Sequence, residues 1–217
     1  MAAAGREIPL KKGESALLVI DMQKGFAVPG KGICSDIDPE NIPEKDQYLF
    51  NRISQLVVPN VAELIRHCEQ NKCEVIYTYV ENLTQDGRDR SLDYKITGFS
   101  FPKGSEDAEL LDEIKPIRPE DTIMIPKTAC SVFNSTNIEY VLRNLGVTQL
   151  AVCGLVTNQC VESAVRDGAD KGFLISVLED CIATHDQPAH DAALKNMKGF
   201  GRIVSYKTIM EELTKWQ

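Results

Sequence analysis

The sequence predicts a three-layer α/β fold, in which helices cover both faces of a mostly parallel, doubly wound sheet of six strands. Two observations lead to this fold class. Short apolar runs rich in valine and isoleucine alternate along the chain with segments of helical periodicity, which is the order that βαβ units produce. The runs are apolar nearly throughout, as expected for parallel strands that are buried on both faces.

Six apolar runs are predicted to be strands. The strong ones are ALLVI (16–20), EVIYTYV (74–80), QLAVCGLV (149–156) and FLISVL (173–178), and the weaker ones are TIMIP (122–126) and RIVSY (202–206). In doubly wound sheets the ligand binds beyond the carboxyl ends of the strands. The residues that follow each run are therefore the first candidates for a functional site.

Helical spacing of apolar residues predicts five helices, over residues 53–68, 138–145, 161–169, 188–199 and 209–216. Pro59 is expected to break or restart the first of them. Ser135 is the expected N-cap of the second, and Gly146 its C-terminal stop. Gly172 is expected to close the third helix, and Pro188 suits the first turn of the fourth.

The chain is predicted to fold as one domain, 1–217, with a core over about residues 15–213. Its 217 residues suit a single domain, and neither a Pro/Gly/Ser-rich linker nor an internal repeat divides them. The segment 82–119 is polar and poorly periodic. A loop of that length usually covers a site or is mobile.

Charge and composition exclude several classes of partner. The formal net charge of −8 argues against nucleic acid and against anionic membranes. No run of apolar residues is long enough to span a membrane, and the first fifteen residues lack the apolar core of a signal peptide. The seven cysteines are scattered without a CxxC motif, which indicates a reducing compartment. We expect a cytoplasmic protein, with signal-independent export left open.

Cys160 is the first candidate for chemistry. It lies in GLVTNQCVESA (154–164), at the start of the helix that follows a predicted strand. The helix dipole and the free N–H groups at that position lower the pKa of a thiol. A free cysteine is also often a small buried residue with no further role, so the position of Cys160 alone leaves both interpretations open.

Asp21 and Lys127 end two other predicted strands, in LLVIDMQKGF and PKTACSVFNST. Taken alone, Asp21 has the alternative role of a turn or cap residue, and Lys127 that of an ordinary exposed lysine. A nucleophilic cysteine needs a proton acceptor and a charge that stabilises its thiolate. Because all three residues end strands at one edge of the sheet, we expect them to act together.

Four stretches of the chain resemble the isochorismatase-like cysteine hydrolases, a family of the isochorismatase, N-carbamoylsarcosine amidohydrolase and ureidoacrylate amidohydrolase type. They are LLVIDMQKGF (17–26), PKTACSVFNSTNI (126–138), GLVTNQCVESAVRDG (154–168) and VLEDCIATHDQPAHDAAL (177–194). The resemblance covers about residues 16–213. It implies an enzyme without a cofactor, in which Asp21, Lys127 and Cys160 form the catalytic triad.

The resemblance also implies a mechanism. Asp21 would take the proton of Cys160, Lys127 would stabilise the resulting charges, and the thiolate would attack a carbonyl carbon to form a thioester that water hydrolyses. The backbone N–H groups of Thr157 and Cys160 would form the oxyanion hole. A non-proline cis peptide is expected between Val156 and Thr157.

The substrate stays open between two classes. The segment around Cys160 is most similar to the family's carbamoyl and ureido hydrolases, which favours a small amide, carbamoyl or ureido compound. The alternative is hydrolysis of the enol ether of isochorismate to 2,3-dihydro-2,3-dihydroxybenzoate and pyruvate, for which some relatives need no cysteine. The candidate substrate-binding residues are Gln23, Phe26, Asn82, Phe133 and Asn158.

Other classes fit the sequence less well. The family's metal-dependent nicotinamidases carry histidines after the second strand, and YTYVENLTQDGRDRS (77–91) has none. His185 and His190 lack the further ligands of a metal site, so we expect no metal. Neither GxGxxG nor GxxxxGK[ST] occurs, which argues against a nucleotide- or flavin-binding domain. A non-catalytic scaffold would not need the triad, and the resemblance suggests a homo-oligomer, dimer or tetramer, acting on a small molecule.

Overall fold

The computed structural model describes residues 5–216. Its single sheet has the order β3-β2-β1-β4-β5-β6, and all neighbouring strands run parallel. The strands are β1 (Ser15–Ile20), β2 (Glu74–Val80), β3 (Ile123–Lys127), β4 (Gln149–Leu155), β5 (Leu174–Ala183) and β6 (Gly201–Val204). The predicted fold class and all six predicted strands are confirmed, although β5 continues to Ala183.

Helices and helical turns connect the strands. They are α1 (Lys24–Ala27), η1 (Gly32–Cys34), α2 (Glu44–Arg52), η2 (Ile53–Val57), α3 (Val58–Gln70), α4 (Leu92–Ile96), η3 (Glu106–Ala108), η4 (Asp112–Ile114), η5 (Pro119–Asp121), α5 (Val132–Ser135), α6 (Ile138–Asn144), η6 (Thr157–Val161), α7 (Glu162–Asp170), α8 (Gln187–Met197) and α9 (Tyr206–Thr214). The elements η2 and η6 are π-helical turns. The five predicted helices correspond to η2 with α3, and to α6, α7, α8 and α9.

The structure confirms that the helix restarts at Pro59, whereas the predicted N-cap of the second helix is wrong. The proline lies in the first turn of α3, and the π turn η2 joins α3 to α2 without a gap. A π turn just before the proline accommodates its missing N–H. Ser135 belongs to α5 and its hydroxyl donates to Ser131 O at 2.8 Å. The chain becomes extended at Thr136, so Asn137 is the N-cap of α6.

The sheet separates two apolar cores, which makes three layers. Leu17 and Val19 of β1 face the core under α2, α3 and α9, whereas Leu18 and Ile20 face the core under α6, α7 and α8. This alternation follows from the twofold side-chain period of a strand. Within residues 5–216, no helix is both long and apolar enough to cross a membrane.

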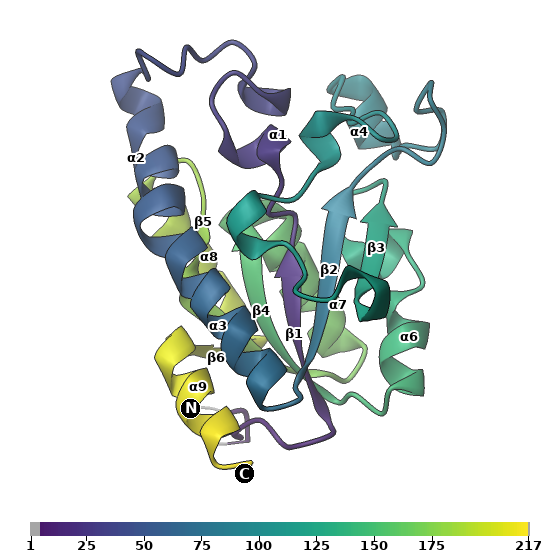
Figure 1. The fold of residues 1–217 in the computed structure, drawn as a ribbon, viewed down its shortest axis with the longest axis vertical. Helices are drawn as coiled ribbons and strands as arrows, with labels where there is room; N and C mark the ends of the chain where they lie inside the picture. Colours follow the sequence, from purple (N-terminus) through teal and green to yellow (C-terminus); the bar gives the residue numbers. More distant parts are fainter. Residues whose placement is uncertain (1–4, 217) are drawn as a thin grey trace.

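The carboxyl ends of the strands gather at one end of the molecule. In Figure 1 the arrowheads of β2 and β3 point toward the end where α1 and α4 lie, and α9 lies at the other end. Gly154 lets β4 approach β1 closely at this edge, since its φ is 123° and a Cβ there would lie 1.9 Å from Ile20 O. Only glycine fits such a contact.

Candidate active site

Asp21, Lys127 and Cys160 converge at the carboxyl edge of the sheet. Lys127 Nζ lies 2.9 Å from Asp21 Oδ2 and 3.3 Å from Cys160 Sγ. The same ammonium donates to the carbonyl groups of Ala129 at 2.9 Å and Cys130 at 3.0 Å. The side chains of Asp21 and Lys127 are fully buried, and Cys160 is 4% exposed. The structure therefore brings the three strand-end residues into one cluster.

The backbone of the sheet explains how two charged side chains meet across β2. Asp21 has a φ of 51°, in the left-handed region that costs a non-glycine residue about 1–3 kcal/mol. Its N–H donates to Thr78 O at 2.9 Å, and the Thr78 hydroxyl donates to Asp21 Oδ1 at 3.3 Å. Lys127 is the last residue of β3 and lies beside Val80 of β2, so its long side chain passes the end of β2 to reach Asp21.

Burial and charge set the protonation of this cluster. Burial raises the pKa of Asp21 well above its ordinary value, although Lys127 opposes the shift. Burial alone would lower the pKa of Lys127, but the facing Asp21 and Cys160 raise it. The contact with Cys130, followed by burial, raises the pKa of Cys160, so this thiol keeps its proton at rest. Among the described residues, Asp21 Oδ2 has the ionic contact with Lys127 but no hydrogen bond, which leaves it free to accept a proton.

The turn that carries Cys160 is fixed on both sides. Thr157 Oγ1 lies 3.2 Å from His190 Nδ1 of α8, and Asn158 Oδ1 accepts from the Thr184 hydroxyl at 2.7 Å. Cys160 follows within the π turn η6, directly before α7. Single π turns are frequent at functional sites.

The cis peptide of this turn lies one bond earlier than predicted. It joins Leu155 to Val156, and the predicted Val156–Thr157 position is wrong. The apolar run in the sequence continues through Val156, but β4 ends at Leu155, so Val156 already belongs to the turn.

His190 connects Thr157 to Arg52, a half-buried arginine of α2. Arg52 Nη2 lies 3.0 Å from His190 Nε2, and the same guanidinium donates to Glu179 O at 2.8 Å and Ile182 O at 2.9 Å. Arginine can only donate, so Nε2 accepts and the proton lies on Nδ1, which donates to Thr157 Oγ1. Burial and Arg52 lower the pKa of His190 to about 4, and the ring stays neutral near pH 7.

A cavity of about 830 Å³ adjoins this cluster, and both Cys160 and Gln159 line it. Phe26, Phe99 and Phe101 form part of its wall, with ring centroids 5.0–5.5 Å apart. Phe99 and Phe101 come from the 82–119 segment that the sequence predicts to be a loop. The wall is therefore built from two segments that are far apart in the chain.

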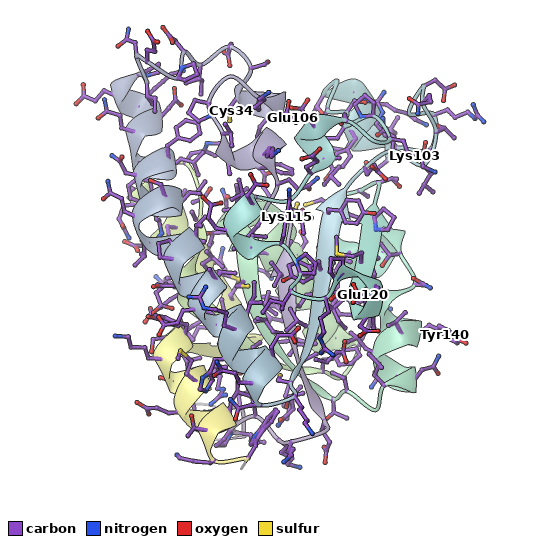
Figure 2. The ribbon with its side chains drawn as sticks, in the orientation of Figure 1. Cys34, Lys103, Glu106, Lys115, Glu120 and Tyr140 are labelled. Atoms are coloured by element: carbon purple, nitrogen blue, oxygen red, sulfur yellow. The ribbon has the colours of Figure 1, made fainter. Side chains whose placement is uncertain are left out.

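Ion pairs and backbone hydrogen bonds hold these two segments together. Lys31 Nζ donates to Glu106 Oε2 at 2.7 Å, and the Gly32 N–H donates to Asp107 Oδ1 at 3.0 Å. Figure 2 labels Cys34 and Glu106, one residue from each segment, at the end of the molecule that carries α1 and α4. These contacts thus stabilise the cavity wall from its outer side.

The structure places one of the five predicted substrate-binding residues in the cavity wall, namely Phe26. Gln23 is fully buried and uses its amide on Val80 and Ala108 O, so it does not line this cavity, and its contact with a substrate stays a prediction. Phe133 packs on Phe173 in the core under α6 and α7, with ring centroids 5.7 Å apart, and does not line this cavity either.

The two asparagines lie near the cavity without lining it. Asn82 is buried behind Ser100, a wall residue to which its amide donates at 2.9 Å. Asn158 is exposed and turned toward Thr184, whereas its neighbour Gln159 lines the cavity. The sequence does not show which side chains of a π turn face the cavity, and a substrate contact of Asn158 stays a prediction.

Sequence reasoning missed several residues of the cavity. These are Ile33, Asp36, Asp93, Tyr94, Phe99, Phe101, Cys130 and Gln159. Most of them lie in segments without periodicity, and the sequence carries no signal that these segments meet. Cys130 was within reach of prediction, because it lies three residues after Lys127.

No group of three or more His, Cys, Asp or Glu side chains within residues 5–216 is arranged to hold a metal ion. Both ring nitrogens of His190 are engaged, by Arg52 and Thr157. His67 Nε2 contacts Met210 O at 2.9 Å, near the other end of the molecule. The absence of a metal stays a prediction of the sequence.

A buried thiol lies beside a carboxylate and an ammonium, next to a cavity at the strand ends of an α/β sheet, and such an arrangement can activate a cysteine for hydrolysis. The isochorismatase domain model matches residues 15–208, and the chain belongs to the isochorismatase family. It is thus a hydrolase of this family.

Solved structures share the fold at low sequence identity. A cysteine hydrolase from Pseudomonas syringae pv. phaseolicola aligns with a TM-score of 0.80 and 21% identity, over 97% of each chain. The N-carbamoylsarcosine amidase of Thermoplasma acidophilum aligns with a TM-score of 0.68 and 22% identity, over 89% of this chain and 96% of the other. A nicotinamidase from Bacillus subtilis aligns with a TM-score of 0.69 and 22% identity, over 88% of this chain and 99% of the other.

Proposed function

We propose that this chain hydrolyses a small amide, carbamoyl or ureido compound through a thioester on Cys160. The observation that carries the proposal is the contact of one buried ammonium, Lys127 Nζ, with both Asp21 and the Cys160 sulfur beside a cavity that Cys160 lines. A thiol placed beside a base and a cation is an activated nucleophile. Structural neighbours include two enzymes named as amidases of small molecules.

The proposed reaction involves two groups with a raised pKa, the Asp21 carboxyl group and the Cys160 thiol. Asp21 Oδ2 takes the thiol proton while the Cys160 sulfur attacks the carbonyl carbon, and the Lys127 ammonium stabilises the negative charge that develops. When the tetrahedral intermediate collapses, Asp21 returns the proton to the departing nitrogen, which leaves as ammonia or an amine. Asp21 then deprotonates a water molecule that attacks the thioester, and Cys160 recovers its proton as the acid leaves.

The negative oxygen of the tetrahedral intermediate needs donors that are already in place. In this proposal the backbone N–H groups of Thr157 and Cys160 supply them. Support comes from the two side-chain contacts that fix the turn, from Thr157 to His190 and from Asn158 to Thr184. A turn held in this way needs little reorganisation during the reaction.

Two variants of His190 test its two hydrogen bonds one at a time, because each variant keeps a polar group at only one of the two ring positions. Asparagine places a donor near the Nδ1 position, facing Thr157, and glutamine places a polar group near Nε2, facing Arg52. We expect His190→Gln to lower kcat about tenfold with KM nearly unchanged, because losing a buried hydrogen bond costs about 1–3 kcal/mol. His190→Asn should stay within about threefold of the wild type. Equal kcat values for the two variants in steady-state kinetics would show that the ring does not position Thr157.

The charge of the cavity favours an amide over isochorismate. Two carboxylates, Asp36 and Asp93, are among the lining residues, and none of the described lining residues is Lys or Arg. Isochorismate carries two carboxylates, which this cavity would repel. A screen of small amides, carbamoyl and ureido compounds and isochorismate, with ammonia and pyruvate measured in parallel, should yield ammonia. Pyruvate production that survives Cys160→Ala and is lost in Asp21→Ala would establish the enol-ether reaction instead.

The same two carboxylates predict a preference for uncharged substrates. We expect a neutral amide such as benzamide to be hydrolysed with a kcat/KM about tenfold higher than that of its 4-carboxylate analogue at low salt. The double variant Asp36→Asn/Asp93→Asn should remove most of this difference, whereas Asp112→Asn, an exposed residue outside the cavity wall, should not. A difference that is insensitive to the double variant and to salt would contradict the electrostatic explanation.

A further inference from the structure

Cys130 is a second thiol beside Cys160 that the proposed reaction does not use. The two Sγ atoms lie 3.9 Å apart, and Cys130 Sγ lies 3.6 Å from the hydroxyl of Ser163. All seven cysteines lie in the described part of the chain, and Cys130 alone is partly exposed, because the other six are buried. A reagent from solution therefore meets Cys130 before it meets Cys160.

Cys130 is reachable from two sides. It lines the 830 Å³ cavity together with Cys160. It also lines a separate groove of about 460 Å³, whose other lining residues include Ser131, Ser163 and Asp167. An oxidant or a reducing thiol can thus approach Cys130 through the groove while a substrate occupies the cavity.

The surroundings stabilise a thiolate on this pair. Lys127 donates to Cys130 O and to Cys160 Sγ, so its positive charge lies beside both cysteines. The hydrogen bond with Cys160 is the main cause that lowers the pKa of Cys130 to about 6. Near pH 7 the Cys130 sulfur is therefore a thiolate, which is the more nucleophilic form of a cysteine and the form that peroxides oxidise.

We propose that Cys130 and Cys160 form a site of reversible oxidation, at which a hydroperoxide converts the two thiols into a disulfide. The Cys130 thiolate attacks the outer peroxide oxygen and the O–O bond breaks. A sulfenic acid forms on Cys130, and the hydroxide or alkoxide that leaves takes a proton from solvent to become water or an alcohol. The Cys160 sulfur then attacks the Cys130 sulfur, and the S–S bond forms. Hydroxide leaves and takes the Cys160 proton as water, so two thiols supply the two electrons that the peroxide accepts.

The geometry requires a small movement. The sulfurs must close from 3.9 Å to about 2.05 Å, which rotation of the Cys130 side chain toward the cavity can supply. The disulfide occupies the nucleophile, so hydrolysis stops until a dithiol reduces the bond. The disulfide also protects Cys160 from irreversible oxidation, since a sulfur in a disulfide is not on the pathway from thiolate through sulfenic acid to sulfinic acid.

The test is peptide mapping of the full-length reduced protein after treatment with hydrogen peroxide. The wild type should lose the mass of two hydrogen atoms and show a Cys130–Cys160 cross-link that dithiothreitol reverses. Fragment spectra are needed, because no Lys or Arg separates Cys153 from Cys160. Cys160→Ser should accumulate a sulfenic acid on Cys130 that dimedone traps. Cys73→Ala, a buried cysteine far from the pair in the fold, should cross-link like the wild type.

Cys130→Ser and Cys130→Ala provide the decisive comparison, after circular dichroism has shown that the variant used is folded. Both should lose the cross-link, and Cys160 should instead progress to a sulfinic acid that dithiothreitol does not reverse. The proposal is overturned if wild-type Cys160 reaches the sulfinic acid without a cross-link and at the rate seen in the Cys130 variants. Mapping needs no substrate, so this outcome is independent of the proposed hydrolysis.

Discussion

Replacing Cys160 by alanine is expected to lower kcat for amide hydrolysis by at least about 10³-fold, because no other thiol is placed to attack from the same position. Cys130 is 3.9 Å away and lines the same cavity, but its sulfur contacts Ser163 rather than Asp21. Cys160→Ser should be nearly as inactive, since Asp21 is too weak a base for a hydroxyl group. Ammonia release, followed under saturating substrate, measures the loss.

A conservative control separates chemistry from folding. Cys153→Ala also removes a buried thiol of the same strand-and-turn unit, since Cys153 is 0% exposed in β4. We expect it to lower stability while leaving most of kcat. If Cys160→Ala retained more than a tenth of the wild-type kcat, Cys160 would not be the nucleophile.

Lys127→Met should remove activity and stability together. It leaves the Asp21 carboxylate buried without a counter-ion, and breaking one partner of a buried ion pair costs about 3–5 kcal/mol of unfolding free energy. The variant also loses the charge that stabilises the thiolate. Urea denaturation and ammonia release measure the two effects on the same protein.

Two further variants separate these effects. The double variant Asp21→Asn/Lys127→Met has no buried charge at the site, so it should recover part of the stability and none of the activity. Glu212→Gln breaks another buried ion pair, with Arg202 at 2.7 Å between α9 and β6, away from the cavity. It should lower stability while kcat persists at a temperature where the variant is folded. Recovery of activity in the double variant would contradict the role given to Lys127.

The sequence was sufficient for the sheet and for the residues at its ends. The inner strands β1, β2, β4 and β5 are mostly buried on both faces, which restricts their composition enough to make them visible as strong apolar runs. The edge strands β3 and β6 are less buried, and they correspond to the two weaker runs. Asp21, Lys127 and Cys160 could be placed together because parallel strands end at one edge. Their distances and their burial needed the structure, and so did the contact with Cys130 that, followed by burial, raises the pKa of Cys160.

The cavity was mostly beyond sequence reasoning, because its wall depends on contacts between distant segments. Gln23 seemed a pocket residue from its place after Asp21, but its amide joins Val80 and Ala108, which is 85 positions away. Phe99 and Phe101 lie in an aperiodic segment that carries no helical or strand signal. Phe133 follows Lys127 closely, yet it turns to the core because α5 packs on α7, where its ring meets Gly168.

The mass of the acid-quenched protein during turnover tests the central claim most directly. The wild type is mixed with an amide, or with an ester of the same acyl group that deacylates more slowly than it acylates, and is quenched at short times. We predict an added mass equal to the acyl group, mapped by fragmentation to Cys160 and lost as the acid product forms. Continued turnover with Cys160 unmodified at every time point, and undiminished in Cys160→Ala, would contradict the thioester mechanism.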